Sequence, residues 1–348
     1  MSAVAGALTS AELGSVREVL SGAGEVVDGA LAAELLTSGR SNVTVLLRDR
    51  SQRWVLRTPP RAGRTPSAHD VAREHRVTSA LVGTGVPVPR AVALCEDESV
   101  LGGPFAIAAF VDGASVQSRS EFDELEPAQR DRIGPVLAAT LASLHAVDPG
   151  HVGLRDFARW DGYTARQLGR WRKQWALVGD QGTDGLAQEV SDRLLAAVPE
   201  QERTSIVHGD FRIDNTIVGL GSSLSVNAVV DWELSTLGDP VADVAMMCAY
   251  RLPAFDHVIG ERAAWTSPEL PAVVELAAAY EAAGGAPLTN FDFHLGLAYF
   301  KIAVIAAGIA HRARESAIEK LEKTPPAAVA VEPFLVAALE TLRLRHAG

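Results

Sequence analysis

The chain has 348 residues, which is enough for two lobes that each bury a core of their own. Apolar residues make up 47% of the sequence and charged residues 22%, a balance typical of a soluble globular protein. The formal net charge of −11 argues against nucleic acid as a partner, because a phosphate backbone attracts a basic surface.

Cysteine usage and apolar segments predict a reduced, cytoplasmic protein that does not enter a membrane. The two cysteines, Cys95 and Cys248, fit neither a disulfide framework nor a zinc site by number and spacing. Residues 1–10 lack the positive charge and the long apolar core of a signal peptide. The longest apolar stretch, residues 302–310, is too short to span a bilayer.

The first third of the chain contains both helix and strand signals. Residues 10–20 predict a capped amphipathic helix, and residues 30–36 favour a helix by propensity alone. Residues 43–48 and 53–57 are rich in apolar and β-branched side chains and predict a β-hairpin. Further along, the sequence predicts a helix from about residue 67 and strands over residues 91–94 and 104–111.

Beyond residue 113 the sequence becomes mainly helical. Apolar residues at helical spacing predict helices over residues 129–145, 186–198, 271–283, 291–314 and 332–345. His145 lies at the end of the first of these helices, where we expect it to interact with terminal carbonyl groups.

Residues 159–175 are unusually rich in cations and tryptophans for an acidic protein. Arg166, Arg170 and Lys173 fall on one face of a predicted helix, and tryptophans form a second stripe. The basic face can be read as a surface for an anionic substrate, such as the phosphates of coenzyme A. It can equally be read as solvated charge above a tryptophan-packed core.

A short motif in the middle of the chain has the layout of a phosphoryl-transfer site. Residues 206–215 contain the pattern H-G-D-x-x-x-x-N, with Asp210 five residues before Asn215. A strand-like apolar run then ends at Asp231, and a further Asp pair follows at Asp239 and Asp243. Phosphoryl transfer requires one Asp for the acceptor hydroxyl group, and an Asn and a second Asp to hold Mg²⁺ against the phosphates.

This motif resembles the catalytic loop and metal-binding Asp of the aminoglycoside phosphotransferase and choline-kinase-like family. The chain is most similar to a bacterial branch related to the kinase domains fused to acyl-CoA dehydrogenases. The resemblance is also carried by Gly39-Arg40-Ser41-Asn42, Val55-Leu56-Arg57-Thr58-Pro59-Pro60, Arg73-Glu74-His75-Arg76-Val77 and Asp231-Trp232-Glu233. It implies an α+β, bilobal protein-kinase-like fold, with a small β-rich lobe at residues 1–112 and a larger, mainly helical lobe at residues 113–348. It also implies that residues 30–36 form the first strand.

The resemblance implies a role for each residue of the motif. Asp210 would be the catalytic residue that accepts the proton of the hydroxyl group, and Asn215 and Asp231 would bind Mg²⁺. His208 and Asp243 would brace the catalytic loop through hydrogen bonds. Asp214, also in this loop, is expected to face solvent or to cap the turn.

The resemblance also implies an ATP site in the first lobe. Its nucleotide-binding residues would be Gly39, Ser41, Asn42, Arg57, Glu74, Ala109 and Val111. Arg57 stands where the family carries a lysine that holds the phosphates, and Glu74 would orient it; an exposed arginine and an exposed glutamate are the alternatives. Backbone groups of Ala109 and Val111 would contact adenine.

The function implied is an ATP- and Mg²⁺-dependent kinase whose partner is a small molecule with a hydroxyl group. A hydroxyacyl-CoA is one candidate acceptor, with Tyr163, Arg166 and Arg170 as its binding residues. An aminoglycoside or another antibiotic is the alternative. A nucleotide-binding regulator without catalysis is a second alternative, motivated by Arg57 and the glycine-poor loop. The protein could be a monomer or a homodimer.

Overall fold

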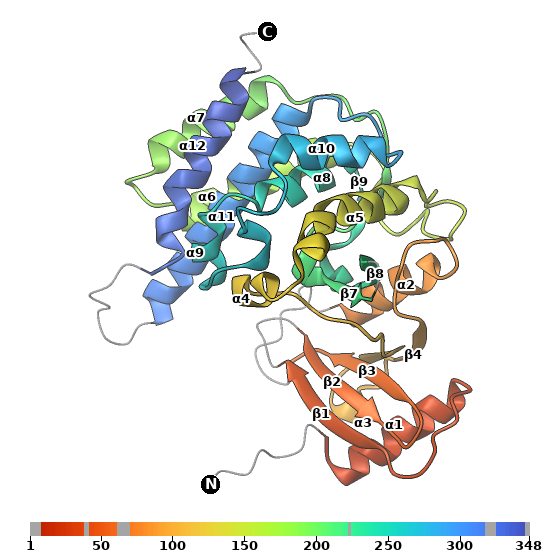
Figure 1. Ribbon diagram of the computed structural model, residues 1–348. Coiled ribbons are helices and arrows are strands. Elements are labelled where there is room, and N and C mark those ends of the chain that lie inside the picture. Colours follow the sequence, from red (N-terminus) through yellow and green to blue (C-terminus); the bar gives the residue numbers. More distant parts are fainter. Residues whose placement is uncertain (1–7, 38–41, 61–69, 222–223, 317–324, 345–348) are drawn as a thin grey trace. The chain divides into compact units, whose positions relative to one another are not determined.

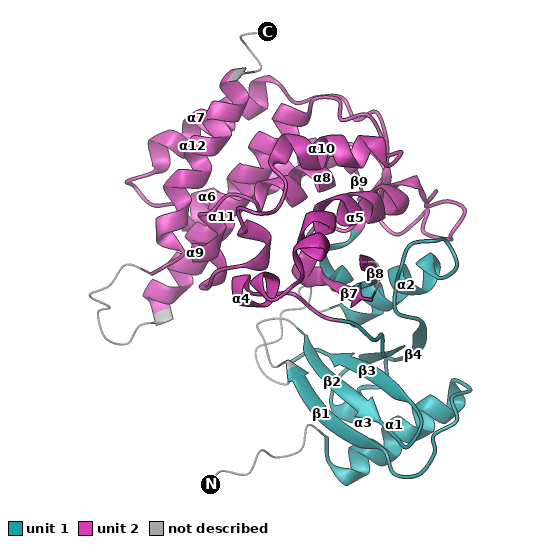
Figure 2. Cartoon of the chain, viewed as in Figure 1, with its two compact units in different colours: residues 1–113, 227–235 teal, residues 114–226, 236–348 magenta. Residues whose placement is uncertain are grey.

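The computed structural model describes residues 8–37, 42–60, 70–221, 224–316 and 325–344, which form two compact units (Figures 1 and 2). The first unit holds residues 1–113 and the segment 227–235, and the second holds residues 114–226 and 236–348. This division differs from the expected single boundary after residue 112, because the short segment that contains Asp231 groups with the first unit.

The first unit is built on a five-stranded sheet, coloured red to orange in Figure 1. In spatial order the strands are β1 (Ala32–Thr37), β2 (Val43–Arg48), β3 (Arg53–Thr58), β5 (Phe105–Ala109) and β4 (Ala91–Cys95). Every neighbouring pair of these strands is antiparallel. The unit also contains the helices α1 (Ser10–Gly22), α2 (Val71–Leu81) and α3 (Glu98–Leu101), and the 3₁₀ turn η2 (Trp232–Leu234).

Strand β1 confirms the strand that the family resemblance implies, against the helix propensity of its sequence. Ala33 pairs with Leu47 of β2, so this edge strand obtains its hydrogen bonds from the sheet. Tertiary pairing of this kind routinely overrides local propensity. The predicted hairpin between β2 and β3 is also present. Its turn is fixed by the Asp49 carboxylate, which accepts the backbone N–H groups of Ser51 and Gln52.

The core of the first unit determines which way Arg57 points. Trp54 and Leu56 of β3 are buried in a cluster with Val16 and Leu20 of α1. Burial of each such side chain contributes about 1.5–3 kcal/mol. Because successive side chains on a strand point to opposite faces, Arg57 lies on the face away from this cluster.

The second unit is mainly helical. Its helices are α4 (Arg119–Asp123), α5 (Pro127–Ala146), α6 (Tyr163–Val178), α7 (Asp184–Ala196), α8 (Pro240–Ala249), α9 (Phe255–Ile259), α10 (Val273–Ala282), α11 (Phe291–Ser316) and α12 (Ala328–Leu344). Its shorter elements are β6 (Ser205–Val207), η1 (Ile213–Asn215), β7 (Thr216–Leu220), β9 (Thr236–Gly238) and η3 (Ala264–Thr266). Strand β8 (Leu224–Val229) carries the chain from the second unit into the first.

Helix α11 is the long core helix of the second unit and contacts α12, α8 and α6 (Figure 1). By length and composition alone it could cross a membrane, but 83% of its most apolar window is buried inside the fold. A core helix has the same apolar composition. Strand β6 pairs antiparallel with β9, with Ile206 opposite Leu237, and this pairing fixes the chain immediately before His208.

Candidate active site

Arg57 forms the centre of an ion-pair cluster in the first unit. Its guanidinium group donates to Glu74 Oε1 at 2.5 Å and to Asp231 Oδ1 at 2.9 Å. Glu74 reaches this position because it shares the buried face of α2 with Val71 and Val77. The structure thus brings together three of the predicted site residues. It also shows why arginine is not interchangeable with lysine here, because two nitrogens of one planar group serve two carboxylates.

The charges in this cluster alter each other's protonation. Burial raises the pKa of Glu74 to about 7, although the charge of Arg57 acts in the opposite direction. Burial also disfavours the charged form of Arg57, but Glu74 and Asp231 outweigh this effect and raise its pKa. Asp231 adopts a left-handed conformation, with φ 65° and ψ 57°. Non-glycine residues rarely adopt this conformation, and it recurs at functional sites.

The remaining nucleotide-site predictions have mixed outcomes. Gly39 and Ser41 lie outside the described residues. Asn42 is buried, and neither amide atom of its side chain has a hydrogen-bond partner among the described residues. The N–H group of Ala109 donates to the Arg90 carbonyl at 2.9 Å, and the predicted contact of Ala109 backbone groups with adenine stays a prediction.

Val111 lies beyond the end of β5, in the chain that leads to the end of the first unit. Its predicted contact with adenine stays a prediction.

In the second unit, Asn215 and Asp210 are bound to each other. Asn215 Nδ2 donates to the backbone carbonyl of Asp210 at 2.7 Å and to its carboxylate at 3.0 Å. Because both partners are acceptors, these contacts assign the amide orientation and leave Asn215 Oδ1 as an acceptor for another group. The 3₁₀ turn η1 folds the chain back, so that Asn215 reaches Asp210 five residues earlier in the sequence.

Asp243 of α8 holds the start of the predicted catalytic loop, residues 208–215. It accepts the backbone N–H of His208 at 2.6 Å and that of Gly209 at 2.8 Å. Burial opposes ionisation of Asp243, but a hydrogen bond from His145, electrostatic interaction with His145 and His208, and the N–H of Gly209 lower its pKa. His208 is fully buried, and its Nδ1 accepts the N–H of Asp210 at 3.3 Å. The structure therefore places His208 and Asp243 where they can brace the loop.

The expectation for His145 is wrong. Its Nε2 lies 3.3 Å from Asp243 Oδ2, and its Nδ1 lies 2.8 Å from the Tyr280 hydroxyl group. The ring therefore links α5 to α8 and α10 and does not bind the carbonyl groups at the end of its own helix. Nothing near His145 in the sequence predicts these partners, because they lie 98 and 135 residues further along the chain.

Arg212 is a site residue that the sequence analysis did not single out. Its Nε lies 3.3 Å from Asp210 Oδ1, and its guanidinium group also pairs with Asp214. The aromatic rings of Tyr250 and Phe255 pack against it, each with its centroid 5.4 Å away. Asp214 is therefore part of a partly buried ion pair, and the expectation that it faces solvent or caps a turn is wrong. In the sequence Arg212 lies two residues from both Asp210 and Asp214, and this position could have identified it as a site residue.

Arg212 determines the ionisation of Asp210. Burial disfavours the charged form of Asp210, but Arg212 and a hydrogen bond from the Tyr250 hydroxyl group hold its pKa well below the usual range. The same carboxylates raise the pKa of Arg212. Asp210 is consequently a carboxylate at neutral pH and can accept a hydrogen bond from a substrate hydroxyl group.

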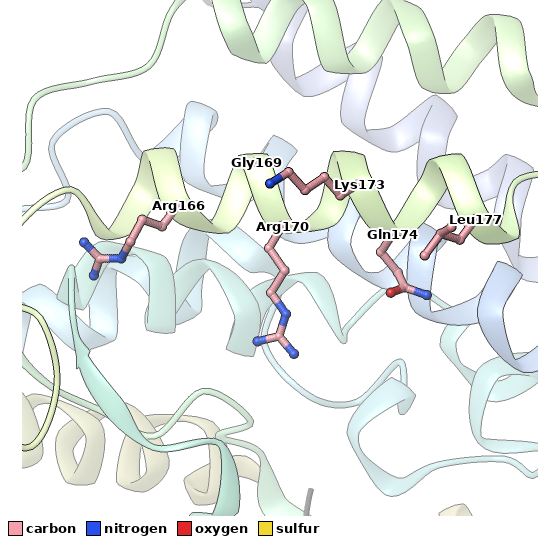
Figure 3. Close-up of a pocket in the computed structure, with 6 residues that line it drawn as sticks. All are labelled: Arg166, Gly169, Arg170, Lys173, Gln174 and Leu177. Carbon is pink, nitrogen blue, oxygen red and sulfur yellow. The ribbon is translucent and has the colours of Figure 1, made fainter. Parts of the chain in front are cut away.

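The predicted substrate residues lie on α6, where an open hollow of about 560 Å³ runs along one face of the helix. Figure 3 shows the residues that line it, Arg166, Gly169, Arg170, Lys173, Gln174 and Leu177. The Arg166 guanidinium group donates to the carbonyls of Asp161 and Arg159. Tyr163 packs closely against Gly238 of β9, and burial raises its pKa.

The sequence pattern described as the phosphotransferase enzyme family matches residues 32–285. Acyl-CoA dehydrogenase family member 10 of Mus musculus is 37% identical over 278 residues, which cover 79% of this chain and 26% of that protein. The chain thus spans about a quarter of the length of this curated relative.

Two solved structures are similar in fold to this chain. A candidate aminoglycoside phosphotransferase from Ralstonia eutropha JMP134 is 31% identical, with a TM-score of 0.79 over 95% of this chain and 98% of that one. A thermostable mutant of aminoglycoside phosphotransferase APH(4)-Ia, in complex with AMP-PNP and hygromycin B, has a TM-score of 0.61 at 15% identity. That likeness covers 90% of this chain and 95% of the other, and it bears on the fold alone.

Proposed function

We propose, because the chain belongs to the phosphotransferase enzyme family, that it transfers the γ-phosphoryl group of ATP to the hydroxyl group of a hydroxyacyl-CoA. The family match and the solved structures confirm the predicted kinase-like α+β fold and the general activity of a small-molecule kinase. The acceptor and the role of each residue are the proposed part.

The catalytic loop is the observation that carries the proposal. Asp210 is held as a carboxylate by Arg212 and is oriented by Asn215. In the proposed reaction the acceptor oxygen forms a bond to the γ-phosphorus, and the bond from that phosphorus to the β,γ-bridging oxygen breaks. ADP leaves with the electron pair, and the hydroxyl proton passes to Asp210. A weakly basic carboxylate suits this reaction. The transition state of phosphoryl transfer is loose, so the attacking oxygen has formed little bond to phosphorus and its proton becomes acidic only late.

The residues proposed for the metal have suitable chemistry. Mg²⁺ prefers oxygen ligands and usually takes one or two from protein carboxylates or amides, with phosphates and water completing the shell. Asn215 offers Oδ1, since its Nδ2 is engaged by Asp210, and Asp231 offers the carboxylate oxygen that Arg57 does not contact. When bound there, Mg²⁺ would neutralise charge on the transferring phosphates.

Arg57 and Glu74 are proposed to serve the nucleotide phosphates. Arg57 stays protonated because two carboxylates contact it, so it is a permanent cation at the end of β3. Glu74 fixes one side of its guanidinium group. The buried amide of Asn42, which has no partner among the described residues, is suited to bind a polar group of the nucleotide.

Two observations favour a hydroxyacyl-CoA as acceptor. The matched relative is named an acyl-CoA dehydrogenase family member, and Arg166 and Arg170 line the hollow on α6, where they suit an anionic ligand. Tyr163 is proposed as a support for the start of this helix. An aminoglycoside acceptor is the second candidate, favoured by the Ralstonia eutropha structure and by the net charge of −11.

The test is Mg²⁺-dependent release of ADP by the purified chain, with hydroxyacyl-CoAs in one series and aminoglycosides in another. We expect stimulation by hydroxyacyl-CoAs, reduced about 100-fold or more in Asp210→Ala. Stimulation by aminoglycosides alone would identify the second candidate. ATP binding without transfer to any acceptor would support a regulator and would contradict the proposal.

A further inference from the structure

Lys301 is a partly buried cation beside the predicted catalytic loop. It lies in the middle of α11, and its Nζ donates to the carbonyl of Gly209 at 3.3 Å. The same ammonium group lies 5.7 Å from the ring centroid of Trp171 on α6. Gly209 immediately precedes Asp210, so Lys301 contacts the loop one residue before the proposed catalytic carboxylate.

The charge of Lys301 is not neutralised by direct contact. Among the described residues, the direct partners of its ammonium group are the Gly209 carbonyl and the Trp171 ring, and neither is a carboxylate. The nearest carboxylates are engaged elsewhere, since Asp210 pairs with Arg212 and Asp243 accepts two backbone N–H groups. A partly buried cation without a carboxylate in contact favours an anionic ligand.

A second cation lies close to Lys301. Arg170 of α6 has its guanidinium carbon 5.3 Å from the centroid of the same Trp171 ring. Burial is the main cause that lowers the pKa of Lys301; Asp210 and Asp243 oppose it, and the charge of Arg170 adds to the lowering. Among the described residues Arg170 likewise makes no ion pair, and it lines the hollow in Figure 3. Positive charge therefore extends from the hollow on α6 to the catalytic loop within one unit.

We propose that Lys301 and Arg170, which share the Trp171 ring, form the acceptor subsite and bind anionic oxygens of the acceptor while its hydroxyl group meets Asp210. This inference rests on the phosphoryl-transfer function proposed above. The ligand chemistry is a phosphate or a carboxylate oxygen. An aminoglycoside would place ammonium groups against these two cations, so the subsite selects against it.

The test is isothermal titration calorimetry of the full chain with AMP-PNP and Mg²⁺ present. The probes are coenzyme A for phosphate, 3-hydroxybutyrate for carboxylate and kanamycin A for a polycation. Lys301→Met and Arg170→Gln are each expected to weaken binding of the favoured anion about tenfold or more. Lys301→Arg keeps the charge and is expected to retain most of the affinity. Arg312→Met removes an exposed cation from the same helix and is expected to bind as the wild type does.

The outcomes separate this inference from the proposed function. Unchanged anion affinity in Lys301→Met and Arg170→Gln overturns the subsite, and so does a wild-type chain that binds neither anion or prefers kanamycin A. ADP release is measured on the same proteins. Anion binding that depends on Lys301, without transfer to any acceptor, would support the subsite and contradict the kinase function. Transfer to an acceptor whose KM is unchanged in Lys301→Met would support the kinase function and contradict the subsite.

Discussion

Arg212 governs the chemistry of the proposed catalytic residue, because it contacts Asp210 and Asp214 at once and is enclosed by two aromatic rings. This arrangement keeps a desolvated carboxylate ionised. Burial alone would protonate Asp210 at a higher pH than in water, and the cation reverses that effect. In the proposed site Asp210 accepts the proton, while Arg212 keeps it ionised and Asn215 fixes its orientation.

The first prediction concerns the pH dependence of activity. Removing the charge in Arg212→Met raises the pKa of Asp210, so Asp210 becomes protonated at a higher pH. The acid limb of the kcat/KM profile is therefore expected to move to higher pH, with a smaller shift in Arg212→Lys. The measurement is kcat/KM for ADP release across the acidic and neutral range. An acid limb that stays in place in Arg212→Met would show that Arg212 does not control Asp210.

At the scale of elements, α8 positions the catalytic loop. The helix begins with Asp239, whose side chain caps the N–H of Val241, and one turn later Asp243 accepts the N–H groups of His208 and Gly209. His145 of α5 contacts the same carboxylate, and Tyr280 of α10 contacts the His145 ring. The position of the loop therefore depends on the packing of three helices around one carboxylate.

The second prediction is the cost of breaking that contact. Asp243→Ala leaves two buried N–H groups without an acceptor and is expected to lower the free energy of unfolding by about 2–4 kcal/mol. Asp192→Ala, at an exposed position on α7, is the control and is expected to change it little. Denaturant unfolding followed by circular dichroism measures both. A loss in Asp243→Ala no greater than that of the control would contradict this account.

The third prediction is the pH dependence of this contribution. The folded-state pKa of Asp243 lies below its ordinary value of 3.8, so the folded protein binds the proton less tightly than the unfolded chain. Its contribution to stability is therefore complete above that ordinary value and is lost as the pH falls towards the folded-state pKa. The difference in unfolding free energy between wild type and Asp243→Asn is expected to shrink on acidification. A difference that grows at low pH would contradict the assignment.

The sequence alone predicted local features of the fold and site, but not the contacts between distant elements. Helical periodicity predicted most of the long helices, and the motif predicted Asp210 and Asn215 because their separation is local. Strand β1 required the family resemblance, because its pairing with β2 is a tertiary effect. The partners of His145 are distant in the chain, and the surroundings of Lys301 come from α6 and the catalytic loop. Neither could be predicted from spacing.

At the scale of the whole molecule, the proposed metal ligands belong to different parts of the chain. Asp231 groups with the first unit through the segment 227–235, and Asn215 belongs to the second. Arg57 and Glu74 accompany Asp231, whereas Asp210 accompanies Asn215. Binding of Mg²⁺ is therefore expected to depend on each of the two side chains.

The fourth prediction tests this dependence through thermal stability. A ligand at about 100 times its Kd stabilises the folded state by about 2.7 kcal/mol, so ATP with Mg²⁺ is expected to raise the Tm of the wild type. Asp231→Ala and Asn215→Ala are each expected to lose the part of this rise that requires Mg²⁺. If both side chains bind the same ion, the double variant is expected to lose no more than either single variant. Additive losses in the double variant would contradict a shared ion.

The transfer of a labelled γ-phosphoryl group from ATP to a hydroxyacyl-CoA, in a single turnover, tests the central claim most directly. Wild type and Asp210→Ala are compared at equal occupancy by ATP. The account predicts labelled acceptor with the wild type and a rate lower by about 100-fold or more in Asp210→Ala. Transfer by Asp210→Ala at the wild-type rate would contradict the assignment of Asp210 as the residue that accepts the hydroxyl proton.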